Sequence, residues 1–378
     1  MLAASVAAAS LPVVGTHLEG LGGATAMTLW GARHVPAFWA STARTLFTPG
    51  SAETRRAERE QTNAVAQAAL AGLVPASALD IAWPEPGHTP PLWQARAHRR
   101  HVYRSAVRYG DHPAQVLDVW RRAALPVQPA PVLIYLPGGA WVHGSRMLQG
   151  YALMHRLAEL GWVCLSIDYR VAPTHRWPRH LRDVKAAIAW ARANVDKFGG
   201  DREFIAISGG SAGGHLASLA ALTANDPALQ PHLVDGSDTS VDAVVSIYGR
   251  YDWEDRSTDE RRAFVDFLER VVVRQRIDKH PDTYRDASPI ARVHSAAPPF
   301  LVIHGTGDTV IPVQQARDFV ARLRAVSTAP VAYLELPGAG HGFDMTDGSR
   351  TASMATAVGV FLGEVRRNQT ERCAGAVI

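Results

Sequence analysis

The sequence has few of the residues that build disulfide frameworks or metal centres. Only two cysteines, Cys164 and Cys373, occur among its 378 residues, and neither lies in a Cys-x-x-Cys spacing. Two isolated cysteines cannot form a disulfide framework, and their spacing does not suggest a metal site. We therefore expect both to be structural, and no set of metal ligands is visible in the sequence.

Lysine is also scarce, and the net charge is small. Lys185, Lys197 and Lys279 are the only lysines, the formal net charge is +4, and arginines are spread along the whole chain. This pattern is typical of a solvated surface, so we expect no nucleic-acid partner. One short basic cluster, interpreted as a solvated linker, consists of Arg96, His98, Arg99, Arg100, His101 and Arg104.

No apolar run is long enough to predict a membrane span, and no secretory signal is recognisable. The alanine-rich residues 1–15 lack the basic residues that open a signal peptide and are too few to cross a bilayer. The sequence leaves open the compartment (cytoplasm or cell envelope), peripheral contact with a membrane, and the oligomeric state.

The chain divides into two parts near residue 101. A hydrophobic content of 47% supports a large buried core. Residues 1–101 are interpreted as an N-terminal helical cap or appendage with a linker, in which Ser51 caps a helix over residues 51–73. Residues 102–378 are interpreted as the catalytic domain, with residues 252–281 as a candidate cap insertion.

Alternating strand and helix patterns begin at residue 102. Residues 102–109 and 115–119 alternate around a turn, which predicts a hairpin. Short apolar runs, each typical of a buried strand, and amphipathic stretches at 181–194 and 313–326 then alternate along the chain. This order predicts an α/β fold with a mostly parallel sheet. The apolar runs are 132–136, 163–167, 204–207, 243–247, 300–303 and 331–334.

The strongest catalytic signal is Gly-Gly-Ser-Ala-Gly-Gly at residues 209–214, between a predicted strand and a predicted helix. A serine on such a sharp turn is presented as a nucleophile, and Gly209 and Gly213 permit the turn because they lack side chains. The following helix also aims free amides at Ser211, which favours an oxyanion there. The alternative is a glycine-rich turn with an incidental serine.

A serine nucleophile needs a base, and the base needs an orienting carboxylate. His341 lies in a glycine-rich loop just after the last predicted strand, and Asp308 lies just beyond the strand at 300–303. The order Ser, Asp, His is the one expected when the serine occupies this kind of turn.

Each candidate has an alternative interpretation. His341 could be a solvated loop residue, and Asp308 could be a turn residue or a helix cap. Asp344 and Glu335 are rival acids, although Asp344 lies too near His341 in sequence to face its ring easily. His304 is interpreted as a packed residue at a strand end.

From roughly residue 102 to 367, the chain resembles the hormone-sensitive-lipase-like carboxylesterases of the α/β-hydrolase superfamily, especially the actinobacterial Lip esterases. The resemblance implies an α/β-hydrolase fold with helices on both faces of the sheet and a helical cap. Besides the serine motif, the matching segments are Asp-Tyr-Arg-Val-Ala-Pro at 168–173, Phe-Gly-Gly-Asp at 198–201 and Gly-His-Gly-Phe at 340–343.

The resemblance also implies that the amides of Gly139, Ala140 and Ala212 form the oxyanion hole. Two residues depart from the family pattern. Pro137 stands where the family usually has histidine, and Gly210 stands where it often has aspartate. The first departure leaves open how the oxyanion loop is held.

We therefore expect a serine carboxylesterase that acts on small-molecule esters of short to medium chain length through an acyl-enzyme, with no cofactor and no metal. Trp141 and Tyr248, each just beyond a predicted strand, are expected to wall the acyl pocket, with core packing as the alternative.

Two other functions remain open. One is an aryl formamidase or amidase that uses the same triad. The other is a non-catalytic ligand-binding relative, similar to the gibberellin receptors, which have lost the catalytic histidine; His341 argues against it.

Overall fold

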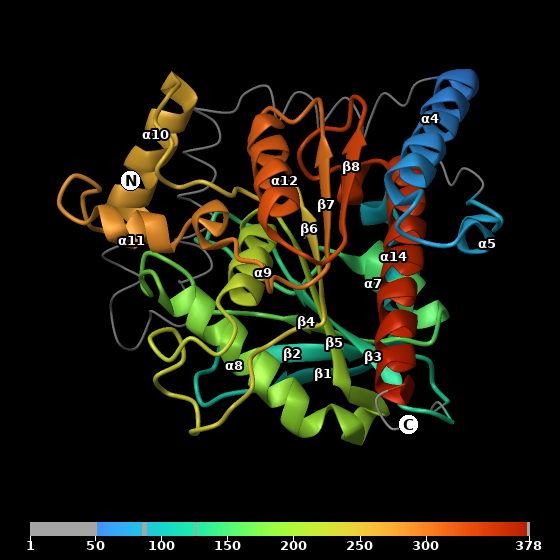
Figure 1. Ribbon diagram of the computed structural model, residues 1–378, viewed down its shortest axis with the longest axis horizontal. Coiled ribbons are helices and arrows are strands. Elements are labelled where there is room, and N and C mark those ends of the chain that lie inside the picture. Colours follow the sequence, from blue (N-terminus) through green and yellow to red (C-terminus); the bar gives the residue numbers. More distant parts are fainter. Residues whose placement is uncertain (1–50, 85–88, 125–126, 376–378) are drawn as a thin grey trace.

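A single eight-stranded sheet lies at the centre of the computed structural model (Figure 1), which describes residues 51–84, 89–124 and 127–375. The strand order is β1-β2-β4-β3-β5-β6-β7-β8. β2 pairs antiparallel with β1 and β4, and all other neighbours are parallel. The strands are β1 (Val102–Arg108), β2 (Val116–Trp120), β3 (Ala130–Leu136), β4 (Val163–Ile167), β5 (Gly200–Gly210), β6 (Ala243–Ile247), β7 (Phe300–Gly305) and β8 (Val331–Leu336). The predicted α/β class and mostly parallel sheet are confirmed.

Helices cover both faces of the sheet, because alternate strand residues point to opposite sides. In β3, Ile134 belongs to the hydrophobic cluster on one face and Tyr135 to the cluster on the other. The first cluster includes side chains of α8 (Arg179–Asn194), α9 (Ala212–Leu222) and α12 (Gln314–Val326). The second includes side chains of α4 (Ala52–Leu70), α7 (Tyr151–Glu159) and α14 (Gly348–Gly375). Both faces of the central strands are therefore buried.

The remaining helices are short and connect these layers. Within the described ranges, none of the helices is long and apolar enough to cross a membrane. The short helices are α5 (Ala76–Leu79), η1 (Pro91–Gln94), α6 (Ala95–His98), η2 (Arg99–His101), η3 (Val195–Phe198), α10 (Asp259–Phe267), η4 (Leu268–Val272), α11 (Pro281–Asp286), η5 (Pro289–Arg292) and α13 (Phe343–Thr346).

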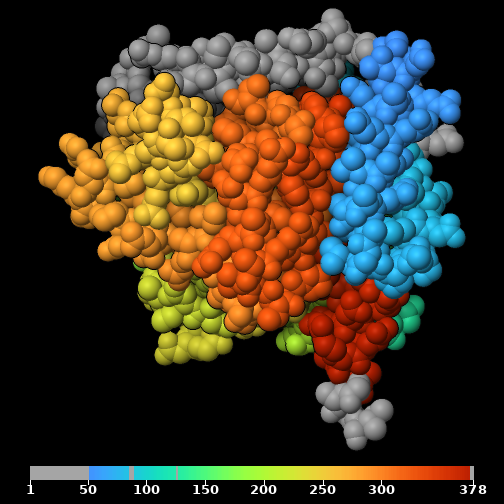
Figure 2. Space-filling view, turned by 45° about the horizontal axis from the view of Figure 1, so that its top comes forward, coloured from blue at the N-terminus to red at the C-terminus, as the bar shows by residue number. Residues whose placement is uncertain are grey.

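The N-terminal helix α4 packs onto the C-terminal part of the chain. The Ser51 side chain accepts a hydrogen bond from Thr54 N at 3.1 Å, as the capping prediction requires. Ala66 and Leu70 of α4 are fully buried in the same hydrophobic cluster as α14. Figure 2 shows α4, in blue, lying against residues coloured orange to red. Residues 1–50 of the predicted cap lie outside the described residues.

The candidate cap insertion at 252–281 contains α10 and η4, which lie to one side of the sheet (Figure 1). Its Trp253 is fully buried, and the Trp177 amide donates to Val272 O at 3.0 Å. These contacts fix the insertion to the loop that follows β4. A capping role for the insertion remains a prediction.

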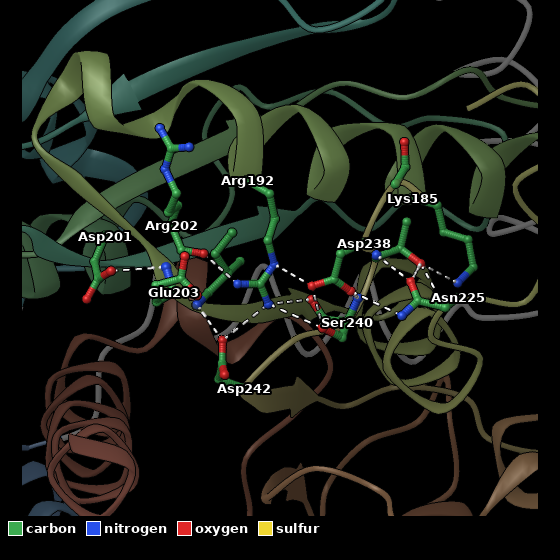
Figure 3. Close-up of polar contacts among 12 residues, drawn as sticks. Lys185, Arg192, Asp201, Arg202, Glu203, Asn225, Asp238, Ser240 and Asp242 are labelled. Carbon is green, nitrogen blue, oxygen red and sulfur yellow. Dashed lines mark hydrogen bonds and ion pairs between the residues drawn. The ribbon is translucent and has the colours of Figure 1, made fainter. Parts of the chain in front are cut away.

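The connection between α9 and β6 (223–242) is tied to α8 by two cations, the buried Lys185 and the partly buried Arg192 (Figure 3). Lys185 Nζ donates to Thr223 O and to Thr239 Oγ1, while Arg192 donates to Ser240 O at 3.0 Å and forms an ion pair with Asp238 at 3.1 Å. These contacts hold a long loop that has little regular structure of its own.

Candidate active site

The predicted nucleophile lies on a strained turn between β5 and α9. Ser211 has φ 57° and ψ −120°, a conformation that L-residues rarely adopt. The turn packs tightly against β3, because a Cβ on Gly213 would lie 2.1 Å from Leu136 O and one on Gly209 would lie 2.5 Å from Gly213 C. Glycine is therefore required at both flanking positions, as the sequence predicted.

The three predicted triad residues come together at the carboxyl ends of the strands. His341 Nε2 lies 3.0 Å from Ser211 Oγ, and His341 Nδ1 lies 2.7 Å from Asp308 Oδ2. We assign the proton to Nδ1 from these partners, so that Nε2 accepts from the serine hydroxyl. This chain of hydrogen bonds is the arrangement in which an imidazole takes a proton from serine while a carboxylate holds the ring.

The Asp308 carboxylate is buried and held by several donors. Its Oδ1 accepts from Val310 N at 2.8 Å and Ile311 N at 2.9 Å, and His304 Nε2 lies 3.3 Å from Oδ2. Burial alone would raise the pKa of Asp308, but electrostatic attraction to His341 and hydrogen bonds from His304 and His341 lower it below its ordinary value. The carboxylate therefore stays ionised. His304, expected only to pack, also contacts this acid.

The two rival acids have other partners. Asp344 is buried and accepts a hydrogen bond from the Tyr248 hydroxyl. Burial raises the pKa of Asp344, and the bond from Tyr248 opposes that rise. Glu335 accepts from Arg317 Nε at 2.9 Å and Nη2 at 2.6 Å. The geometry thus favours Asp308 as the residue that orients His341.

The predicted oxyanion loop lies directly against the nucleophile turn. A Cβ on Gly138 would be 2.7 Å from Gly210 O and 3.0 Å from Ser211 Cβ, so only glycine fits at this approach. The backbone then adopts positive φ at Gly139 (132°) and Ala140 (50°). The backbone of the loop therefore turns at these two residues, next to the point where Gly138 approaches Ser211.

Two side chains hold this loop without the family's usual histidine. Gln149 accepts from Gly138 N at 2.7 Å and donates to Gly138 O at 3.2 Å. The Tyr169 hydroxyl donates to Pro137 O at 2.8 Å. No sequence pattern points to Gln149, whereas Tyr169 lies in one of the segments that match the family.

The three predicted oxyanion donors have no competing acceptor. Within the described part of the chain, the N–H groups of Gly139, Ala140 and Ala212 donate to no protein atom. Ala212 is the first residue of α9, where amides lack intrahelical partners and the helix dipole is positive. Free amides beside a nucleophile favour the charge that develops on a carbonyl oxygen during attack.

The two predicted pocket residues are both buried. Trp141 is 2% exposed; its Nε1 donates to His215 Nδ1 at 3.2 Å, and its ring packs against Trp253 at 4.8 Å between centroids. The Tyr248 ring lies 4.7 Å from the His341 ring, and a Cβ on Gly210 would be 2.8 Å from its hydroxyl. These contacts favour packing for Trp141 and place Tyr248 beside the base; the pocket role of both remains a prediction.

The chain matches known esterases over most of its length. A family model described as BD-FAE matches residues 117–323. Esterase LipC of Mycobacterium tuberculosis (strain ATCC 25618 / H37Rv) is 66% identical over 371 residues, which cover 98% of this chain and 92% of that protein. The probable carboxylic ester hydrolase LipM of the same strain is 47% identical over 281 residues, which cover 74% of this chain and 65% of LipM.

Solved structures share the same fold. A structure titled "Truncated form of carbohydrate esterase from gut microbiota" aligns with a TM-score of 0.55 and 26% identity, covering 68% of this chain and 98% of that one. The identity to LipC and LipM confirms the predicted resemblance to carboxylesterases of the Lip type.

Proposed function

Because the chain belongs to the hormone-sensitive-lipase-like carboxylesterases, with a BD-FAE domain at residues 117–323, we propose that this carboxylic ester hydrolase forms its acyl-enzyme on Ser211. The single observation that carries this proposal is the continuous hydrogen-bonded chain from Ser211 through His341 to Asp308. A hydroxyl of ordinary acidity is a poor nucleophile, and this chain supplies the base that it needs.

The first half of the reaction acylates the enzyme. Ser211 Oγ attacks the ester carbonyl as His341 Nε2 takes its proton, and the carbonyl oxygen becomes an oxyanion. The free amides of Gly139, Ala140 and Ala212 stabilise this charge. The tetrahedral intermediate then expels the alcohol, which leaves with the proton from His341. Asp308 stabilises the imidazolium throughout.

The second half releases the acid. His341 takes a proton from a water molecule, the resulting nucleophile attacks the acyl-enzyme carbonyl, and the same oxyanion hole holds the second intermediate. Its collapse returns the proton to Ser211 Oγ and frees the carboxylic acid. These steps use only side chains and amides of this chain together with water.

We infer a preference for small esters of short to medium acyl length, with Tyr248 near the acyl group; the buried contacts of Trp141 support packing more than contact with the substrate. An amidase that acts on aryl formamides is the second candidate, because the same triad serves both reactions. Hydrolysis of matched ester and anilide substrates with acetyl, butyryl, hexanoyl and octanoyl groups tests both points. An esterase hydrolyses the esters far faster; comparable kcat/KM on the anilides would favour the amidase.

A further inference from the structure

The basic cluster interpreted from the sequence as a solvated linker folds against α7. His101 ends η2, just before β1, and His155 and Glu159 lie on α7. One ligand atom from each of these three side chains lies within 4.8 Å of the others. Among the described residues, no other trio of histidine, cysteine, aspartate or glutamate side chains gathers this closely.

Local geometry explains this convergence. His155 and Glu159 are four residues apart on one helix and so share a face, with His155 Nε2 3.4 Å from Glu159 Oε1. The short helices before β1 bring two more imidazoles to the same place. The His155 ring lies 4.9 Å from the His101 ring and 5.0 Å from the His98 ring, measured between centroids.

Two imidazole nitrogens and one carboxylate oxygen form a ligand set that zinc and related borderline metals prefer. All three ligand atoms already lie within 4.8 Å of one another, as the ligands of a single ion must.

We propose that His101, His155 and Glu159 bind a divalent transition-metal ion of the zinc type, at a site separate from the catalytic triad. The three ligands leave a fourth position for water, as in other three-ligand zinc sites. The ion would link the segment before β1 to α7, so its expected role is to stabilise the fold.

Arg100 already binds the Glu159 carboxylate that the metal ion would use. Its Nη2 donates to Glu159 Oε1, and its Nε lies 3.5 Å from His101 Nε2. A metal ion and this guanidinium would compete for the same carboxylate. The Arg100 side chain is 59% exposed, so it can move into water when a metal ion replaces it. Removing Arg100 should therefore tighten metal binding.

The test is titration of the full-length, chelator-treated protein with Zn²⁺ in an isothermal calorimeter. We expect one saturable equivalent. His155→Gln and Glu159→Gln should each weaken binding at least roughly tenfold, since loss of even a second-shell partner costs 10–100-fold. Arg100→Gln should bind more tightly than the wild type. His280→Gln, at an exposed histidine outside the cluster, is the matched control and should leave binding unchanged.

Melting temperatures provide a second measurement and show that each variant folds. At the same concentration, Zn²⁺ should raise the melting temperature of the wild type more than that of His155→Gln, because the stabilisation follows the affinity of the native state for the ion. If His155→Gln does not fold, His101→Gln replaces it. The proposal is overturned if no saturable binding occurs, if binding survives all three ligand substitutions, or if Arg100→Gln does not tighten it.

Discussion

Ser211 combines an unfavourable backbone conformation with the contacts that a nucleophile requires. A residue in such a sparsely populated region costs of order 1–3 kcal/mol, so surrounding contacts must hold it there. Ser211 N donates to Ile247 O at 2.9 Å, and His215 N donates to Ser211 O at 3.0 Å. The neighbouring strand and the first turn of α9 therefore fix the serine from both sides.

At the same scale, we expect Asp308→Asn to lower kcat much more than Asp344→Asn. Asp308 accepts from His341 Nδ1, whereas Asp344 accepts from Tyr248. Loss of the orienting carboxylate costs about 10⁴-fold in a serine protease, because the histidine tautomer becomes wrong. Steady-state kinetics of the two purified variants decide the point. Equal losses, or a larger loss in Asp344→Asn, would mean that the acid is misassigned.

Tyr248→Phe should destabilise the protein, because it removes the side-chain donor from a buried carboxylate. An unsatisfied buried group costs about 1–3 kcal/mol of unfolding free energy, and more when charged. Tyr333→Phe is the matched control, since Tyr333 donates to Glu335 at 2.7 Å from a half-buried position, where Arg317 remains as a partner. Urea unfolding of both variants measures the difference. A Tyr248→Phe variant as stable as Tyr333→Phe would show that the Tyr248–Asp344 bond contributes little.

At the scale of elements, Gly213→Ala should abolish activity and destabilise the turn. Its new Cβ would lie 2.1 Å from Leu136 O, so β3 or α9 must move. Gly363→Ala is the control, because a Cβ there meets nothing within 4 Å on helix α14. That change should stabilise the protein by about 0.8–1 kcal/mol, the helix propensity difference between the two residues. Thermal melts and ester hydrolysis distinguish the two; full activity in Gly213→Ala would refute the tight-turn argument.

Gln149→Ala should lower kcat more than it changes KM. Gln149 binds both backbone groups of Gly138, so its loss frees the loop that carries two oxyanion donors. Removal of a single oxyanion donor costs about 10²–10³-fold in kcat elsewhere, and we expect a smaller loss because the amides remain present. Parallel measurement of kcat and KM tests this. A change confined to KM would indicate a role in substrate binding instead.

The elements themselves were largely predictable, because buried parallel strands form distinct apolar runs. The run at 204–207 predicted only the centre of β5, which extends from Gly200 to Gly210. Its ends are glycine-rich and polar, so no hydrophobic pattern marked them. Gln149 was missed for a related reason: its role depends on a contact across 11 residues, which no local pattern records.

At the scale of the whole molecule, the sequence predicted that helices cover both faces of the sheet, but not which helices pack against each other. That α4 packs on α14 and shares a hydrophobic cluster with it depends on contacts between opposite ends of the chain. Periodicity shows which face of a helix is apolar but not what covers it. Helix α4, which precedes the predicted boundary at residue 101, thus shares a hydrophobic cluster with elements that follow it, and the division into two domains stays a prediction.

Covalent labelling of Ser211 tests the central claim most directly. The wild type and Ser211→Ala should be incubated with an organophosphonate ester, and the modified residue identified by mass spectrometry while ester hydrolysis is followed in parallel. We predict one adduct, on Ser211, in the wild type, and neither labelling nor appreciable hydrolysis in Ser211→Ala, since only the residual effect of binding and the oxyanion hole would remain. An adduct on another residue, or a Ser211→Ala variant that still labels and hydrolyses esters, would contradict the account.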